Sequence, residues 1–316
     1  MKPLRIAVVG AGAFGSNHLR VLQELPDVQI AAVVEPDETR RKAWAVPGCR
    51  HIEELPPGID AAIVATPTQT HSAIACQLMD AGIDVLVEKP IASDFPAALR
   101  LKTKAEENQR VLQVGHLERF NPAVRALRSV VSLPLFFEIH RMSLFSPRSL
   151  DVDVILDLMI HDLDIVLSLV GGRPEEVQAA GISILSAKVD IANVRLSFPG
   201  GCVANLTASR VSTEKIRKIR VFQPKQYISV DYGRQDAASF TISEGPNIHY
   251  EQLPVEKAEP LRLELEHFLG CCRTRERPSV GADEAIRALE LALIIQAKID
   301  EHAQVVSDSV AAYAAR

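Results

Sequence analysis

The sequence predicts an α/β protein, with a doubly wound parallel sheet in its N-terminal part and an α+β domain with a mostly antiparallel sheet after it. Short continuous runs of Val, Ile, Leu and Ala alternate with helix-length segments up to about residue 120. A glycine-rich turn follows the first of these runs. Beyond residue 120 the pattern changes to alternating apolar and polar residues, which is typical of antiparallel strands with one solvated face.

The N-terminal domain is expected to contain buried parallel strands. Strands are predicted at 5–9, 28–34, 60–67, 84–90 and 110–116, with helices from the glycine turn to about residue 24, at 70–81 and at 94–108. Strands that are apolar throughout, alternating with helices, indicate a parallel sheet that is covered on both faces.

The second domain is expected to begin with a helix and then to form a sheet. A helix is predicted near 122–131, a strand near 135–142 and a helix at about 154–170, followed by several period-2 strands and by helices at about 259–273 and 282–302. Turn residues such as "GRPEE" and "PGG" separate the strands. We therefore divide the chain into domains 1–120 and 121–316.

Composition excludes several classes of protein. With 316 residues, 47% of them hydrophobic, the chain can bury a large core, and its formal charge of −5 argues against a nucleic-acid-binding protein. Its apolar runs are shorter than the roughly 18 residues that a membrane-spanning helix needs. The five cysteines form no CxxC pair, and one vicinal pair within an odd count indicates reduced thiols. A cytoplasmic protein without a membrane span is the expectation.

The glycine-rich turn predicts a dinucleotide site. "GAGAFG" contains Gly10, Gly12 and Gly15, with Ala13 and Phe14 between them, at the junction of the first strand and the first helix. Such a turn lets the backbone approach a pyrophosphate at the helix N-terminus.

The end of the second predicted strand indicates which dinucleotide is bound. Glu35 stands there, where an acid can bind the ribose 2′-hydroxyl and favour NAD over NADP. Arg40 and Arg41 lie close downstream, so use of both cofactors stays open.

Lys89 follows a buried strand directly, in "VLVEKPIA". The carboxyl ends of parallel strands are where open α/β sheets bind ligands, and Pro90 favours an extended conformation at Lys89. Beside a nicotinamide, a lysine can stabilise the negative charge that develops on a substrate oxygen. The alternative is a surface lysine in a turn.

The segment "LDLMIHDLDI" places Asp157, His161 and Asp164 at i, i+4 and i+7 of a predicted helix, on one face. This row could be the acid/base groups of an enzyme, the ligands of a metal ion or a purely structural face. Asp162 points about 100° away from His161 and is expected to be a surface or packing residue.

Taken together, "GAGAFG", "ATPTQTH", "EKP" and the D157-x3-H161 helix resemble the glucose–fructose oxidoreductase/inositol dehydrogenase (Gfo/Idh/MocA) family. The resemblance implies a Rossmann domain joined to a large open-faced sheet, a cofactor that stays bound, and oxidation of a sugar or cyclitol hydroxyl or reduction of a carbonyl. Alcohol oxidation beside a lysine needs no metal ion, and a cationic lysine would compete with one, so we expect no metal at this site. The resemblance also implies a catalytic lysine at Lys89 and an acid/base pair at Asp157 and His161. It further implies cofactor contacts at Thr66, Pro67 and His71 of "ATPTQTH", and at Glu88 and Lys89 of "EKP".

Two segments, "VGHLERFNPAV" and "DVDVILDLMIHDLDIVLSLVGG", resemble a branch of the family that acts on UDP-N-acetylglucosamine. This implies oxidation of the 3-hydroxyl to the 3-keto sugar, which an aminotransferase then converts to a 3-amino sugar for lipid A. A dehydrogenase of a free sugar, inositol or another polyol, and a non-catalytic NAD-binding regulator, are the alternatives.

A nucleotide sugar carries a pyrophosphate, which arginines and lysines bind. Lys89, Asp157 and His161 are expected to contact the sugar, and Arg119 and Arg148 are the preferred pyrophosphate contacts. Further basic candidates are Arg141, Arg210, Lys215 and Arg217. The family's open sheet commonly packs between subunits, which implies a homo-oligomer, either a dimer or a tetramer.

Overall fold

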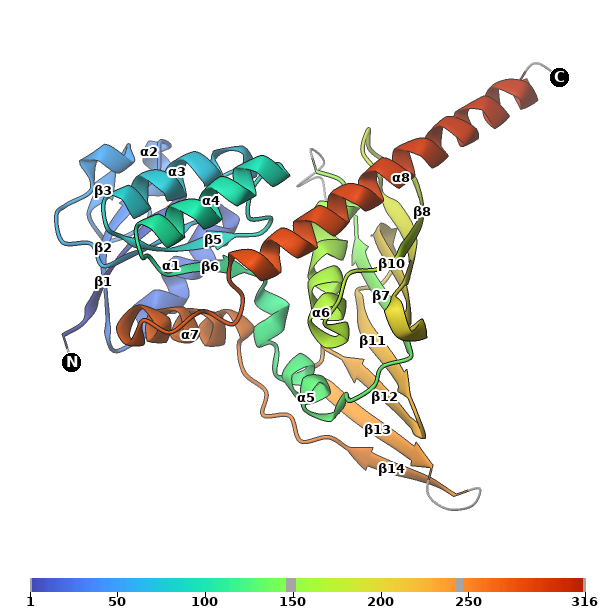
Figure 1. Ribbon diagram of the computed structural model, residues 1–316. Coiled ribbons are helices and arrows are strands. Elements are labelled where there is room, and N and C mark those ends of the chain that lie inside the picture. Colours follow the sequence, from blue (N-terminus) through green and yellow to red (C-terminus); the bar gives the residue numbers. More distant parts are fainter. Residues whose placement is uncertain (1, 146–151, 243–246, 315–316) are drawn as a thin grey trace. The chain divides into compact units, whose positions relative to one another are not determined.

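The computed structural model describes residues 2–145, 152–242 and 247–314, and the chain forms two compact units (Figure 1). The first unit comprises residues 1–120 and 259–286, and the second comprises residues 121–258 and 287–316. The sequence placed all of 121–316 in one domain, which is wrong for the segment 259–286. This segment returns to the first unit because apolar side chains of its helix, such as Leu265 and Phe268, belong to the first unit's core.

The first unit is built on a parallel six-stranded sheet with the strand order β3-β2-β1-β4-β5-β6. This is the order of a Rossmann fold, in which the topology reverses between the strands at the centre. The strands are β1 (Leu4–Val9), β2 (Val28–Val34), β3 (Gly48–Cys49), β4 (Ala61–Val64), β5 (Asp84–Glu88) and β6 (Leu112–Gly115). Four of them are buried along almost their whole length, as their continuous apolar sequences predict.

Helices cover both faces of this sheet. They are α1 (Ala13–Glu24), α2 (Glu38–Lys42), α3 (Thr68–Asp80), α4 (Phe95–Glu107) and α7 (Pro260–Thr274), with short 3₁₀ turns η1 (Ile52–Glu54) and η2 (Leu117–Phe120). Helices α3 and α4 pack together on one face, whereas α1 and α7 share a core on the other (Figure 1). Asp94 caps α4 by accepting a hydrogen bond from the backbone of Ala97, as an N-cap aspartate should.

The second unit is built on an eight-stranded sheet with the order β14-β13-β12-β11-β7-β10-β9-β8. All neighbouring pairs are antiparallel except β7 with β10, which is parallel. The strands are β7 (Phe136–Leu144), β8 (Glu176–Ile182), β9 (Ile191–Ser197), β10 (Val203–Ser212), β11 (Ile216–Gln223), β12 (Gln226–Asp231), β13 (Asp236–Ile242) and β14 (Ile248–Gln252). The 3₁₀ turn η4 (Pro199–Gly201) joins β9 to β10.

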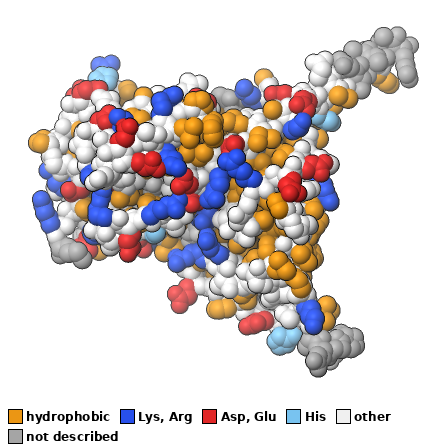
Figure 2. Space-filling view, viewed as in Figure 1, with side chains coloured by type: hydrophobic (Ala, Val, Ile, Leu, Met, Phe, Trp, Pro, Cys, Tyr) orange, Lys and Arg blue, Asp and Glu red, His pale blue; other side chains and the backbone are white. Residues whose placement is uncertain are grey.

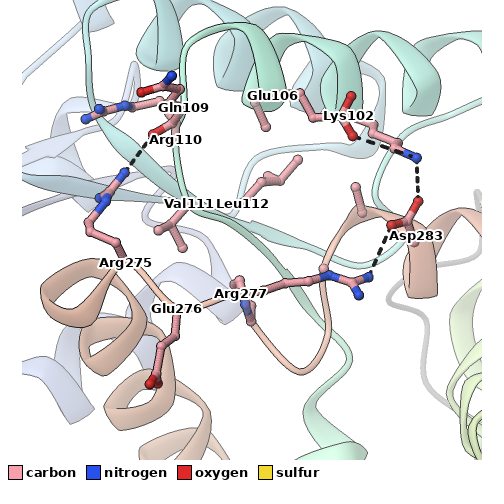
Figure 3. Close-up of a pocket in the computed structure, with 14 residues that line it drawn as sticks. Lys102, Glu106, Gln109, Arg110, Val111, Leu112, Arg275, Glu276, Arg277 and Asp283 are labelled. Atoms are coloured by element: carbon pink, nitrogen blue, oxygen red, sulfur yellow. Dashed lines mark hydrogen bonds and ion pairs between the residues drawn. The ribbon is translucent and has the colours of Figure 1, made fainter.

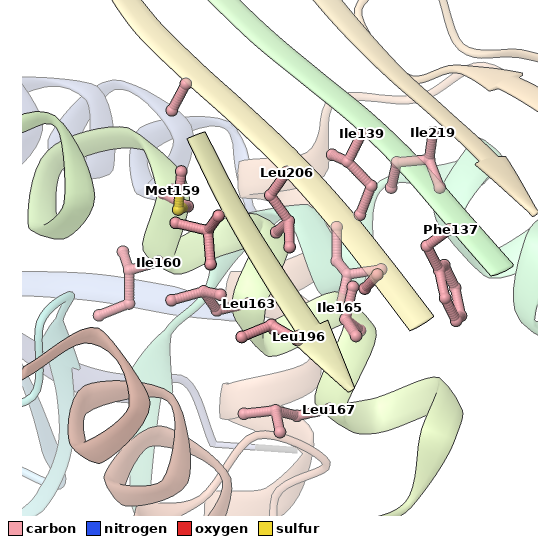
Figure 4. Packing of buried hydrophobic residues seen from close by; sticks show 14 of the residues in the cluster. Phe137, Ile139, Met159, Ile160, Leu163, Ile165, Leu167, Leu196, Leu206 and Ile219 are labelled. Atoms are coloured by element: carbon pink, nitrogen blue, oxygen red, sulfur yellow. The ribbon is translucent and has the colours of Figure 1, made fainter. Parts of the chain in front are cut away.

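One face of this sheet is packed against helices. These are α5 (Pro122–Val130), the π-helical turn η3 (Ile155–Met159), α6 (Ile160–Val170) and the part of α8 (Ala282–Ala314) that begins at Arg287. Figure 4 shows Met159, Leu163 and Ile165 of the helical segment against Leu196 and Leu206 of the sheet, all of them buried. The strands alternate between buried and exposed residues, so their polar face points away from this core.

Three short or peripheral elements were not predicted from the sequence, namely α2, β3 and β14. Strand β14 is an edge strand whose residues are all exposed, so burial imposes no alternation that a sequence could reveal. Helix α8 continues beyond the predicted end near residue 302. Val305 and Tyr313 in this continuation are exposed, so their burial gives no signal from which a sequence could predict a helix. Within the described ranges, the helices lack the combination of length and apolar character that crossing a bilayer requires.

A buried ion pair fastens α6 to the sheet. Asp162 accepts two hydrogen bonds from Arg141 of β7, at 2.8 Å to Nε and 3.0 Å to Nη2, and a third from the hydroxyl of Tyr232 at 2.7 Å. The guanidinium also lies over the Tyr232 ring, 5.1 Å from its centroid. All three side chains are buried, so the expectation of a surface position for Asp162 is wrong, whereas a packing role agrees with this position. The carboxylate needs these donors because a buried charge is stable only when it is paired.

We expect Arg141→Met to lower the free energy of unfolding by about 3–5 kcal/mol, because it leaves the Asp162 carboxylate buried without its cationic partner. The matched control is Arg173→Met, which removes an arginine from an exposed pair with Glu290 in the same unit. That change should cost less than about 1 kcal/mol. Urea unfolding at neutral pH measures both values, and equal losses in the two variants would contradict a structural role for the buried pair.

Candidate active site

The glycine-rich turn between β1 and α1 has the shape that a dinucleotide needs. Gly10 has φ +94°, and a Cβ there would lie 2.6 Å from the carbonyl oxygen of Ala65, while a Cβ at Gly15 would lie 1.8 Å from that of Gly10. A Cβ at Gly12 would meet nothing within 4 Å. Two glycines therefore allow the turn to close, and the third leaves open space at the N-terminus of α1.

The start of α1 leaves its first amides available to a ligand. Gly12 is the N-cap residue and provides no side-chain hydrogen bond to the helix, and Ala13 and Phe14 are exposed. Unpaired N–H groups and the positive end of the helix dipole suit a pyrophosphate. The turn thus fits the phosphates of NAD.

Glu35 follows β2 and joins two loops at the same edge of the sheet. Its Oε2 accepts a hydrogen bond from the backbone of Ala11 at 2.8 Å, and its Oε1 accepts one from the backbone of Asp37 at 3.0 Å. A carboxylate has about four acceptor positions, so each oxygen retains one for a ribose hydroxyl. Arg41 donates to the carbonyls of Glu35 and Pro36, while the side chain of Arg40 is exposed.

The loop after β4 is braced by a buried histidine. Nε2 of His71 lies 2.8 Å from the carbonyl oxygen of Thr66, and Nδ1 lies 2.9 Å from that of Pro90. Burial lowers the pKa of His71, although the two carbonyls oppose this shift. With its side chain 1% exposed, His71 positions the loop and does not present a surface to a cofactor, which corrects its predicted role as a direct contact. Thr66 and Pro67 are the more accessible residues of this loop.

Glu88 and Lys89 lie at the carboxyl end of β5. Oε1 of Glu88 lies 2.7 Å from Nε2 of His18 on α1, and its Oε2 accepts a hydrogen bond of 3.2 Å from the backbone of Lys89. Burial alone would raise the pKa of Glu88, but the hydrogen bond and charge of His18, together with Lys89, lower it overall. Lys89 is partly exposed and precedes a cis peptide bond to Pro90.

The carboxyl ends of the parallel strands therefore gather the predicted cofactor residues within the first unit. Gly12 follows β1, Glu35 follows β2, Thr66 follows β4, and Lys89 follows β5. In open α/β sheets this edge is where ligands bind.

The second unit supplies Asp157 and His161 from one helical segment. Asp157 lies in the π-helical turn η3, where the backbone N–H of Ile160 bonds to the carbonyl of Ile155, and His161 lies in the first turn of α6. Both side chains are partly exposed. The predicted regular helix is therefore wrong at this point, and π-helical turns are frequent at functional sites.

Asp153 fixes the start of this segment. Its Oδ1 accepts hydrogen bonds of 2.9 Å from the backbone of both Ile155 and Leu156, and its Oδ2 contacts the amide of Gln296 on α8. The backbone of Val154 also donates to the carbonyl of Val189 at 3.0 Å. The backbone that carries Asp157 is thus held from two sides.

Asp164 does not share the exposure of the predicted polar row. It is buried, as Asp162 is, so only Asp157 and His161 face solvent among the acidic and histidine residues of "LDLMIHDLDI". In the described parts of the chain, no cluster of three or more His, Cys, Asp or Glu side chains has the arrangement of a metal site.

The basic candidates for the pyrophosphate differ in availability. Arg119 is partly exposed in η2 of the first unit, and Arg148 lies outside the described residues. Arg141 is committed to Asp162, and Arg210 pairs with Asp190 and donates to the carbonyls of Val152 and Val189. The side chains of Arg141 and Arg210 are both buried, so the expectation that they contact the pyrophosphate of the substrate is wrong.

A surface hollow of about 580 Å³ in the first unit lies apart from these residues (Figure 3). Its basic side chains are already paired, Lys102 and Arg277 with Asp283, and Arg275 with Asp84. None of the predicted site residues lines it.

Sequence reasoning missed three residues that support the site, namely His18, Asp153 and Glu264. His18 stands on the buried face of α1, where a polar residue among apolar neighbours is a usable signal. Glu264 comes from a distant part of the sequence, and only the return of the chain to the first unit brings it near β6.

Comparisons with known proteins agree with this architecture. Residues 4–116 match the oxidoreductase family described by its NAD-binding Rossmann fold, and residues 127–229 match the Gfo/Idh/MocA C-terminal domain. The UDP-N-acetylglucosamine 3-dehydrogenase of Acidithiobacillus ferrooxidans is 34% identical over 313 residues, which cover 95% of this chain and 99% of that protein. An inositol 2-dehydrogenase of Corynebacterium glutamicum is 30% identical over 192 residues, 56% of this chain and 57% of that protein.

Solved structures show the same fold. A structure of the Acidithiobacillus enzyme superposes with a TM-score of 0.89 at 32% identity and covers 96% of this chain and 99% of its own. An Agrobacterium radiobacter oxidoreductase, solved with NAD⁺, L-tartaric acid and magnesium, gives a TM-score of 0.84 at 17% identity over 95% and 97% of the two chains, a likeness of fold alone. The chain therefore belongs to the Gfo/Idh/MocA family of NAD-binding oxidoreductases.

Proposed function

We propose that this protein oxidises the 3-hydroxyl of UDP-N-acetylglucosamine to the 3-keto sugar with NAD. The observation that carries this proposal is the near full-length likeness to an enzyme of that activity, in a chain that keeps a lysine at the end of β5 and an aspartate–histidine pair on η3 and α6. A 3-keto product has the carbonyl that an aminotransferase needs, so such an enzyme is the expected next step toward a 3-amino sugar.

The proposed roles follow from the chemistry of alcohol oxidation. NAD, when bound, accepts the hydride from the carbinol carbon. His161 takes the hydroxyl proton, since neutral imidazole is a base suited to near-neutral pH. Asp157 orients His161 or binds a neighbouring hydroxyl, and Lys89 stabilises the negative charge that grows on the oxygen. We infer that Arg119 and Arg148 contact the pyrophosphate of the substrate.

A dehydrogenase of a free polyol is the second candidate. The observation in its favour is the likeness to inositol 2-dehydrogenases. This likeness spans little more than half of each chain at 29–30% identity for two of them, and 92% of each chain at 26% identity for the scyllo-inositol 2-dehydrogenase of Bacillus subtilis. The lysine, aspartate and histidine that the chemistry needs are all present, which argues against a regulator that binds NAD without turnover.

We infer a preference for NAD over NADP from Glu35. Its buried carboxylate is fixed by two backbone donors at the position where a 2′-phosphate would bring a second negative charge. A charge that is held in place and shielded from water repels another more strongly than a mobile surface charge does.

We also propose that the polar face of the eight-stranded sheet packs against a second copy of this chain. A row of aromatic rings crosses five strands of this sheet, from Phe136 through Phe222, Tyr227 and Phe240 to Tyr250, with centroids 4.8–5.9 Å apart. Phe222 is 39% exposed and Tyr250 is 54% exposed. Figure 2 shows hydrophobic side chains gathered on the surface of the second unit, as expected for an interface. The copies would form a dimer or a tetramer.

The five cysteines form no disulfide bonds. Free thiols suit a reducing compartment, so we place the reaction in the cytoplasm.

We expect NADH formation with UDP-N-acetylglucosamine and none with free N-acetylglucosamine or inositol, because the nucleotide supplies binding energy that the free polyols lack. Lys89→Met should reduce turnover by at least about 100-fold, since it removes the charge that stabilises the substrate oxygen, and should weaken NAD binding far less than it reduces turnover. Absorbance of NADH and a fluorescence titration of NADH binding measure the two quantities.

Lys102→Met is the control for this experiment, because Lys102 is a surface lysine of the same unit that pairs with Asp283. It should leave both quantities unchanged. Turnover of inositol alone would select the second candidate, absence of turnover with every polyol would overturn both, and full activity of Lys89→Met would contradict the role of the lysine.

Glu35→Gln should reduce the ratio of kcat/KM for NAD to that for NADP by about tenfold or more, because a hydrogen bond to a charged group is worth about 1.5–3 kcal/mol. Steady-state kinetics with each cofactor measure the ratio. The control is Glu38→Gln, which changes an exposed acid of α2 and should leave the ratio as it is. An unchanged ratio in Glu35→Gln would mean that another residue sets the preference.

Phe222→Arg should dissociate the oligomer, because it places a charge in the middle of the aromatic row. Sedimentation equilibrium compares its mass with those of the wild type and of Leu99→Arg, a substitution of an exposed leucine on α4 of the first unit. A monomeric wild type, or a Phe222→Arg variant of unchanged mass, would exclude this face as the interface.

A further inference from the structure

The first unit buries a carboxyl group that the proposed reaction does not use. Glu264 stands on α7, and its side chain is 0% exposed. Neither of its carboxyl oxygens has a hydrogen-bond partner among the described residues. Such a group is unusual, because buried polar atoms are almost always paired.

The surroundings of Glu264 connect it to the end of β5. Nε2 of Gln113 on β6 donates to the backbone carbonyl of Glu264 at 3.2 Å. Gln113 and Gly115 lie two residues apart on one strand and hence on the same face of the sheet. A Cβ built on Gly115 would lie 3.0 Å from Oε2 of Glu88, so the Glu88 carboxylate passes over this glycine. Glu264, Gln113 and Glu88 thus border one buried polar region.

This region contains acceptors that lack a matching donor. Oε1 of Gln113 is buried and unpaired within the described structure, as are both carboxyl oxygens of Glu264. An ionised Glu264 would add a second negative charge near Glu88 without a donor to stabilise it, at a cost of several kcal/mol. One proton on Glu264 removes that charge and supplies the missing donor. In agreement with a bound proton, the pKa of Glu264 is raised well above its ordinary value. Burial is the larger cause of this shift, and the negative charge of Glu88 is the smaller one.

We propose that Glu264 is a neutral, proton-bearing carboxylic acid that positions Glu88, because it adds no second carboxylate charge beside Glu88 and so lets Glu88 keep its contact with His18. The proposal rests on the proposed function and on the expected contact of Glu88 with the NAD cofactor. Glu264 is thus a positioning residue for cofactor binding, which acts through Glu88 and touches neither cofactor nor sugar.

The neighbouring elements determine how this region responds to pH. The buried or partly buried titratable side chains on the elements around Glu264 include His18 of α1, Asp84 and Glu88 of β5, His116 after β6, Glu118 and Arg119 of η2, and His267, Cys271 and Cys272 of α7 itself. Arg20 and Glu24 of α1 and Arg262, Glu266 and Arg273 of α7 are the further charged residues of these two helices. At alkaline pH, loss of the Glu264 proton would bring a second negative charge toward Glu88 and disturb its position. NADH binding should therefore weaken at alkaline pH through Glu264.

Infrared spectroscopy tests the protonation directly, without a sugar substrate. The difference spectrum between the wild type and Glu264→Gln at neutral pH should contain the carbonyl band of a protonated carboxylic acid, which shifts in D₂O. Glu266→Gln changes an exposed acid on the same helix, paired with Arg262, and should give no such band. Absence of the band from the wild-type difference spectrum would overturn the proposal.

Titration of NADH binding against pH tests the positioning role. At neutral pH the Kd of Glu264→Gln should lie within about threefold of the wild type, because an amide preserves the shape and the donor of a neutral acid. From neutral to alkaline pH the wild-type Kd should rise several-fold more than that of Glu264→Gln, whereas Glu266→Gln should follow the wild type. If the Kd values of the wild type and of Glu264→Gln change in parallel with pH, the positioning role of Glu264 is overturned. This outcome does not depend on the identity of the sugar substrate.

Discussion

Carboxylates that fold out of contact with water need donors, and this requirement shapes both units of the protein. Asp162 takes three hydrogen bonds from Arg141 and Tyr232, which fixes the rotation of α6 and leaves His161 on its accessible side. Glu35 takes two backbone donors and thereby joins the glycine turn to the loop after β2. Glu88 lies within hydrogen-bond distance of His18. In the part of the chain that the structure describes, no donor reaches the carboxyl group of Glu264, which is why we assign it a proton.

Much of the fold could be predicted from the sequence, because apolar periodicity reports burial. The strands of the first sheet are mainly apolar along their length, and those of the second alternate, as their solvent exposure requires. Elements without a burial pattern could not be predicted, such as the exposed edge strand β14. The π-helical turn at Ile155–Met159 was also missed, because a change of hydrogen-bond register leaves no mark on residue spacing.

The candidate site was predictable to the extent that its residues belong to local motifs. The glycine turn, Glu35 and Lys89 follow strands directly, so topology alone gathers them at one edge of the sheet. Partners that are distant in sequence could not be foreseen. Spacing in the sequence does not show that Arg141 pairs with Asp162 and is therefore not available to a pyrophosphate. It also does not show that both ring nitrogens of His71 lie against backbone carbonyls and not against a cofactor.

Transfer of a deuterium label tests the central claim, oxidation at the 3-hydroxyl, most directly. UDP-N-acetylglucosamine that carries deuterium at C3 of the sugar is incubated with the protein and NAD, and the reduced cofactor is analysed by mass spectrometry. The account predicts that the deuterium from C3 appears in NADH, and that label at C2 or C4 does not. NADH that forms without deuterium from C3, or that takes its label from another carbon, would contradict it.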